Sequence, residues 1–173
     1  MEDTANRKTA EEQAGEDLFH FAVDRDDMKT LLAALPEAAG TERGKVEYEL
    51  GILRIVSVGW SIAYFLELSP HKKRLLEVYW KAVQEFAQNV SSAAGLMVGR
   101  EIDYFEILKA RLAMYVEAMR QKPEAREPAV VIGPAFARAC GNEDDVYAVL
   151  TGTKMFIATV GRVKEYLEAI KLK

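Results

Sequence analysis

The sequence has few of the residues that most often carry covalent cross-links or metals. It contains one cysteine, Cys140, and two histidines among 173 residues. A single cysteine cannot form a disulfide within the chain, which favours a reducing compartment. The first residues have neither the basic segment nor the apolar segment of a secretion signal. We therefore expect a cytoplasmic protein whose fold depends on a hydrophobic core.

The sequence also lacks the local motifs of common active sites. It has no Gly-x-Ser-x-Gly elbow, phosphate-binding loop or dinucleotide fingerprint. A di-iron helical bundle needs two Glu-x-x-His pairs, but only Asp17 and His20 pair an acid with a histidine at that spacing. Cys140 has Arg138 as its nearest cation and is more typical of a small apolar core residue. We predict no metal and no cofactor; an enzyme remains an alternative if carboxylates from separate helices come together.

Charge is unevenly distributed along the chain. The formal net charge is −4, and residues 1–27 hold nine acidic and three basic residues. No basic stripe with interleaved aromatic residues is present, so we do not expect nucleic-acid binding. Residues 1–16 contain no large hydrophobic side chain after Met1. We therefore predict a flexible acidic tail over residues 1–16 and a single helical domain over residues 17–173.

An almost unbroken apolar run, EYELGILRIVSVGWSIAYFL, covers residues 47–66. Its apolar part from Leu50 to Leu66 has 17 residues, fewer than the roughly 20 that a membrane-spanning helix needs. Arg54 lies within it, and a central arginine costs about 2.5 kcal/mol or more on insertion into a membrane. The run therefore predicts a buried core helix from about Thr41 to Leu68 and no membrane span.

Helical signals follow one another along the rest of the chain, without the alternation of β-strands. Ser69 and Pro70 predict the start of another helix, and Asn142 predicts the start of the last one. Around Pro134, either a short extended segment over residues 129–133 precedes a helix, or one helix is kinked. We predict an all-α single domain, an irregular bundle of about five to seven helices around the central helix.

Two groups of residues are candidates for ligand binding. His71, Lys72, Lys73 and Arg74 crowd the first turn of a helix, where acids are usual, and could bind an anion. The alternative is a solvated turn that is balanced by the acidic N-terminal residues. The second group could line a pocket with polar tips, although core packing explains its aromatic members equally well. It consists of Arg54, Trp60, Tyr64, Tyr79 and Trp80.

Arg54 has its own alternatives. Because an arginine keeps its charge, a buried one needs a carboxylate or several carbonyl oxygens. It either anchors an anionic ligand between helices, or pairs with a carboxylate such as Glu47, Glu85 or Glu106, or extends to the surface.

The last helix has a narrow apolar seam with spacings of three and four, which is typical of a helix that packs along one partner helix. The seam includes Val149, Phe156, Val160 and Val163. That partner belongs either to the same chain or to a second copy. The leading hypothesis is a non-catalytic binding or interaction protein that self-associates as a homodimer, through this seam or through another apolar face. The alternatives are a helical pocket for a small apolar or anionic ligand and an enzyme with dispersed carboxylates.

Overall fold

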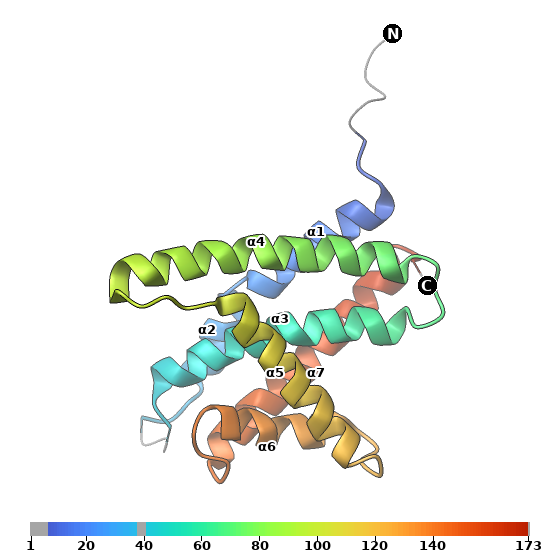
Figure 1. Ribbon diagram of the computed structural model, residues 1–173. Helices are drawn as coiled ribbons and strands as arrows, with labels where there is room; N and C mark the ends of the chain where they lie inside the picture. The colour runs from blue at the N-terminus through green and yellow to red at the C-terminus, as the bar shows by residue number, and fades with distance from the viewer. Residues whose placement is uncertain (1–6, 38–40, 173) are drawn as a thin grey trace.

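The computed structural model describes residues 7–37 and 41–172, and all regular structure in this part of the chain is α-helical (Figure 1). The all-α prediction is confirmed. The described residues form seven helices: α1 (Ala10–Val23), α2 (Asp26–Ala33), α3 (Arg43–Phe65), α4 (Lys72–Val98), α5 (Tyr104–Gln121), α6 (Ala129–Ala139) and α7 (Val146–Ala169).

The long apolar run forms α3, which contacts each of the other six helices. Leu50, Ile52 and Leu53 point in different directions around the helix, and all three are fully buried. A helix that is apolar on every side is stable in water only when neighbours cover it all round. In Figure 1, α4 lies along α3, and α5 crosses α3 obliquely. The helix is shorter than predicted at both ends, and Leu68 is 97% exposed beyond it.

The prediction of a flexible tail over residues 1–16 is wrong for residues 10–16, which belong to α1, whereas residues 1–6 lie outside the described part of the chain. Thr9 caps this helix: its hydroxyl accepts a hydrogen bond from the Glu12 N–H, and the Glu12 carboxylate accepts one from the Thr9 N–H. Such a reciprocal cap satisfies two amide groups that the first turn would leave unpaired. The acidic residues of this segment therefore begin a helix.

Small residues allow α1 to pack closely against α4. A Cβ atom on Gly15 would lie 2.5 Å from Val78 Cγ1, closer than two carbon atoms can approach. Ala14 and Ala22 on the same helix are buried too. At the other side, the Tyr166 hydroxyl of α7 donates a hydrogen bond to Asp17 Oδ2 at 2.7 Å. The first helix is thus held by both α4 and α7.

Four predictions about helix ends differ from the structure. The N-cap of α7 is Asp145, whose carboxylate accepts hydrogen bonds from two amides of the first turn, and not Asn142. Thr41, predicted to cap α3, instead donates its hydroxyl to Asp145 Oδ2 at 2.5 Å. The extended segment before Pro134 does not form, because α6 runs through it as one helix. The N-cap of α4 is His71, and Ser69 Oγ accepts the His71 N–H.

Candidate functional site

Arg54 lies in the middle of α3 with its side chain only 1% exposed. Its Nη2 donates a hydrogen bond to Asp27 Oδ2 of α2 at 3.2 Å, and that aspartate side chain is 53% exposed. Its Nε and Nη1 are buried and have no hydrogen-bond partner among the described residues. A buried donor without a partner is costly, and more so when it carries charge. Two nitrogens of the guanidinium therefore remain unpaired within the described residues.

A second buried ion pair on α3 shows what full pairing looks like. Arg111 of α5 donates two hydrogen bonds to the Glu49 carboxylate, from Nε at 2.9 Å and from Nη2 at 2.7 Å. The Glu49 side chain is only 2% exposed. This two-point geometry is the strong form of an arginine–carboxylate pair. The single contact of Arg54 with Asp27 is a much less complete pairing.

Arg54 lines a pocket of about 260 Å³ at the meeting of α1, α2, α3 and α7. Two exposed cations of α7, Lys154 and Arg162, line the same pocket, and Asp27 is the one acidic residue in its lining. Three cations against one carboxylate give the pocket a positive balance. The remaining lining is made of apolar side chains and two threonines: Phe21, Thr30, Leu31, Met155, Ala158 and Thr159.

Two of the three cations of this pocket lie beside the Phe21 ring. The Arg54 guanidinium lies 4.3 Å from the centre of the Phe21 ring, and the Arg162 guanidinium lies 5.9 Å from it. Both distances are within the range of cation–π attraction. Burial lowers the pKa of Arg54, and the Arg162 charge lowers it further. Asp27 and, to a smaller extent, Asp24 act in the opposite direction and raise the pKa of Arg54. The guanidinium nevertheless stays charged at neutral pH, so the pocket favours an additional anion.

The predicted partners of Arg54 were wrong, because their side chains lie elsewhere. Glu47 forms an ion pair with Arg25, and Glu106 forms one with Lys109. Glu85 lines a different surface pocket, between α1 and α4. The observed partner comes from α2, a short helix whose position against α3 no local pattern could indicate.

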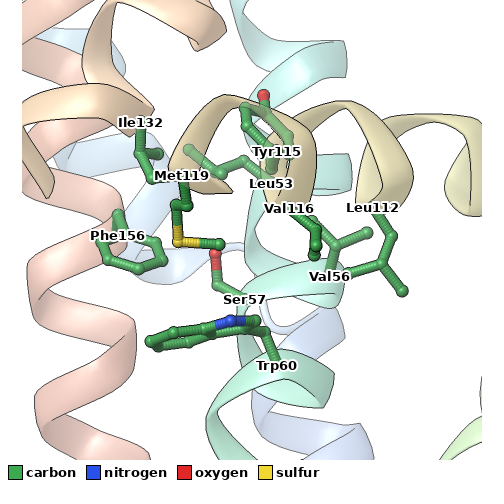
Figure 2. Close-up of a pocket in the computed structure, with 10 residues that line it drawn as sticks. All are labelled: Leu53, Val56, Ser57, Trp60, Leu112, Tyr115, Val116, Met119, Ile132 and Phe156. Carbon is green, nitrogen blue, oxygen red and sulfur yellow. The ribbon is translucent and has the colours of Figure 1, made fainter. Parts of the chain in front are cut away.

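The five predicted ligand-binding residues do not share one pocket. The Tyr79 hydroxyl is buried and donates to the Ile55 carbonyl at 2.7 Å, and Trp80 packs against Gly59, as core residues do. Trp60 and Tyr64 stack on each other with ring centres 4.9 Å apart. Trp60 lines a second, smaller cavity between α3, α5, α6 and α7, separate from the Arg54 pocket (Figure 2).

The basic turn at the start of α4 faces α1. His71 Nδ1 lies 2.7 Å from Glu11 Oε1, and Arg74 Nη2 lies 2.7 Å from Glu12 Oε1. The hydrogen bond with His71 lowers the pKa of the Glu11 carboxyl. Two of the four predicted anion-binding residues are thus already paired with carboxylates of their own chain. The other two predicted members are Lys72, which is half-buried, and Lys73, which is exposed.

The seam of α7 faces the interior of the chain. Phe156 is 5% exposed and Val163 is fully buried, whereas Val149 and Val160 are half-buried. The α7 helix packs against α3 and α6. Phe156 and Val163 therefore do not lie on a surface that a second copy could contact, and this part of the interface prediction is wrong. The partner helices of the seam belong to the same chain.

Sequence reasoning missed most of the residues around Arg54. Lys154, Ala158 and Arg162 follow one another at a spacing of four on α7 and so lie on one helical face. This spacing can be read from the sequence, and it places two cations, Lys154 and Arg162, on the same face of the helix beside the apolar seam. Asp27 and Phe21 gave no such signal, because they reach the pocket only through the packing of α1 and α2.

No known protein family, curated protein or solved structure matches the chain. Within residues 7–37 and 41–172, no helix combines the length and apolar character that crossing a membrane requires. The same residues contain no group of three or more histidine, cysteine, aspartate or glutamate side chains placed to hold a metal ion.

Proposed function

We propose that the protein binds a small amphipathic carboxylate in the Arg54 pocket and does so without catalysis. The observation that carries this proposal is the buried Arg54 guanidinium, whose Nε and Nη1 lack partners among the described residues. A ligand carboxylate would accept hydrogen bonds from these donors, as Glu49 does from Arg111. Lys154 and Arg162 would attract the same charge from the surface.

The size and lining of the pocket support a compact ligand. Its volume of about 260 Å³ is just below the roughly 300–1,000 Å³ of pockets that hold drug-sized molecules. The apolar side chains of Leu31, Met155 and Ala158 would contact a short hydrocarbon or ring. We infer binding rather than catalysis because the ionisable groups of the lining are three cations and one half-exposed aspartate, with no base placed beside a nucleophile.

Isothermal titration calorimetry with hexanoate and 1-hexanol tests the proposal at low salt. We expect saturable binding of hexanoate and none of 1-hexanol, because only the carboxylate pairs with Arg54. Removing a surface cation in Arg162→Gln or Lys154→Gln should weaken hexanoate about two- to fivefold. Lys164→Gln is the matched control, since Lys164 is an exposed lysine of α7 outside the pocket lining.

Equal binding of both probes, or no binding of either, would contradict the proposal. Inorganic phosphate is titrated in parallel: if phosphate binds and hexanoate does not, the apolar part of the ligand is wrong. Native mass spectrometry of gently purified protein complements the titrations, because a retained molecule appears as an added mass.

Self-association, the leading hypothesis from the sequence, is the second proposed function. One observation favours it: α7 carries an exposed apolar face beside its buried seam. Val146 is 63% exposed, Leu150 49% and Ile157 54%, and their spacings of four and seven place them on one side of the helix. If this face forms a dimer, Ile157→Asp should give a folded monomer in light scattering. An unchanged mass would contradict it.

A further inference from the structure

The wall that α7 contributes to the proposed binding pocket has two rows of side chains. Lys154, Ala158 and Arg162 are exposed and follow one another every four residues, so they form an outer row on the solvent side. Met155 and Thr159 are buried and form an inner row. Because an α-helix rises about 1.5 Å per residue, the backbone positions of the two cations are about 12 Å apart along the helix. The exposed side of the pocket therefore has a cation at each end of the outer row, with the small Ala158 between them.

The two outer cations have no anionic partner of their own. Neither Lys154 nor Arg162 forms an ion pair within residues 7–37 and 41–172. The one carboxylate of the lining, Asp27, already accepts a hydrogen bond from Arg54 Nη2 at 3.2 Å. A ligand with a single carboxylate at Arg54 would leave both outer cations unpaired. A second negative charge on the ligand would complete the charge balance of the pocket.

We infer that the ligand of this pocket is a small dicarboxylate. One carboxylate pairs with the buried Arg54, and the other stays at the surface beside Lys154 and Arg162. This inference rests on the proposed binding of a carboxylate at Arg54 and adds the second charge. The outer carboxylate keeps part of its hydration, so placing it there costs far less than burying it.

The apolar part of the lining requires carbon between the two charges. Leu31 and Met155 would contact a hydrocarbon chain, whereas an inorganic dianion such as phosphate would leave them without a contact. The volume of about 260 Å³ limits this chain to a short one, because pockets for drug-sized molecules measure roughly 300–1,000 Å³.

Hexanoate and adipate are the matched probes, because both have six carbons and adipate has a second carboxylate in place of the terminal methyl group. In calorimetry near pH 7 at low salt, we expect adipate to bind about fivefold more tightly than hexanoate, since two exposed ion pairs are added. Monomethyl adipate, in which an ester removes the second charge, should bind no more tightly than hexanoate. Raising the salt to about 200 mM should reduce the advantage of adipate, because salt screens exposed charges.

A double variant, Lys154→Gln with Arg162→Gln, assigns the position of the second carboxylate. We expect the ratio of adipate to hexanoate affinity to fall from about five to about one. The control is Lys122→Gln with Lys164→Gln, which removes the same net charge from exposed residues outside the pocket lining. This control should keep the ratio. All four residues are exposed, so both variants should fold, and the buried Arg54 stays in place.

The outcomes separate this inference from the proposed function. If hexanoate binds saturably and adipate binds no more tightly, the second carboxylate has no place in the pocket, and the inference is overturned while the proposed function stands. The same conclusion follows if adipate keeps its advantage in the Lys154→Gln, Arg162→Gln variant. If neither acid binds, the proposed function fails and the inference fails with it.

Discussion

Glu49 and Arg54 lie five residues apart on α3, and each is only 1% exposed. Glu49 has two short hydrogen bonds from Arg111, whereas Arg54 has one longer bond to the half-exposed Asp27. The buried Glu49 carboxylate is thus fully paired, whereas the buried Arg54 guanidinium is paired only in part. A buried charge that is incompletely paired carries a free-energy cost that a further acceptor would reduce.

Replacing Asp27 tests the pairing of Arg54. We expect Asp27→Asn to lower the free energy of unfolding by about 1–3 kcal/mol, because Arg54 loses its carboxylate partner while remaining buried. The same variant should bind hexanoate more tightly, since the internal competitor is weaker. Urea denaturation measures the first effect and calorimetry the second. Asp26→Asn, on an exposed neighbouring residue, is the control and should stay within about 0.5 kcal/mol of the wild type.

Breaking the Glu49–Arg111 pair should have a larger effect on stability. Arg111→Met should destabilise the protein by about 3–5 kcal/mol, because it leaves a buried carboxylate without its partner. Adding Glu49→Gln should recover part of this loss, because the uncompensated charge disappears. A double-mutant cycle in urea separates the pair from its members. Additive effects of the two substitutions would show that the residues do not interact.

Two glycines of α3 provide a matched pair of substitutions. A Cβ atom at Gly59 would lie 2.3 Å from Trp80 Cζ2, while one at Gly51 would have no atom within 4 Å. We expect Gly59→Ala to destabilise by about 1–3 kcal/mol through overpacking. Gly51→Ala should stabilise by about 0.4–1 kcal/mol, because alanine reduces the freedom of the unfolded chain. Thermal unfolding of both variants checks the difference; equal effects would show that Trp80 moves aside freely.

The contact between α1 and α4 predicts a loss of stability in acid. The hydrogen bond with His71 lowers the pKa of Glu11 in the folded state below its ordinary value of 4.5. Glu11 therefore contributes stability that is fully present above pH 4.5 and is lost as the pH falls through the lowered folded value. Glu11→Gln should show a shallower fall of stability below this pH than the wild type. Glu165→Gln, an exposed residue of α7, should follow the wild type.

Cys140 should be chemically inert in the folded protein. Burial and, to a smaller extent, the nearby Glu49 charge raise the pKa of its thiol to about 12. Because the thiolate is the reactive form, we expect negligible labelling by iodoacetamide at pH 8 and complete labelling in denaturant. Rapid labelling of the folded chain would show that the α6–α7 corner opens readily.

The all-α class and the buried run of α3 followed from patterns that lie within single helices. The charge at Arg54 was recognised in the sequence, but its partner was not, because Asp27 reaches it only through the docking of α2. Glu49 was overlooked, since it lies at the edge of the apolar run, where a glutamate usually faces solvent. Its burial depends on Arg111, which is 62 residues away in the chain.

The order of the N-terminal segment was mispredicted for a different reason. The absence of large hydrophobic residues suggested that residues 1–16 had nothing to bury. Gly15 instead allows the backbone of α1 to approach Val78 so closely that little side-chain surface is required. Contacts made through small residues are difficult to recognise in one sequence, because glycine is typical of loops as well as of close helix packing.

The hydrogen bond between Asp17 and Tyr166 spans 149 residues of sequence. The ribosome therefore releases the first helix long before its partner on the last helix exists. Until α7 has emerged, α1 has only its contacts with α3 and α4, and the domain remains open at that side. Contacts of such large separation in sequence slow folding. A nascent chain that is stalled before Tyr166 should leave α1 exposed to proteases.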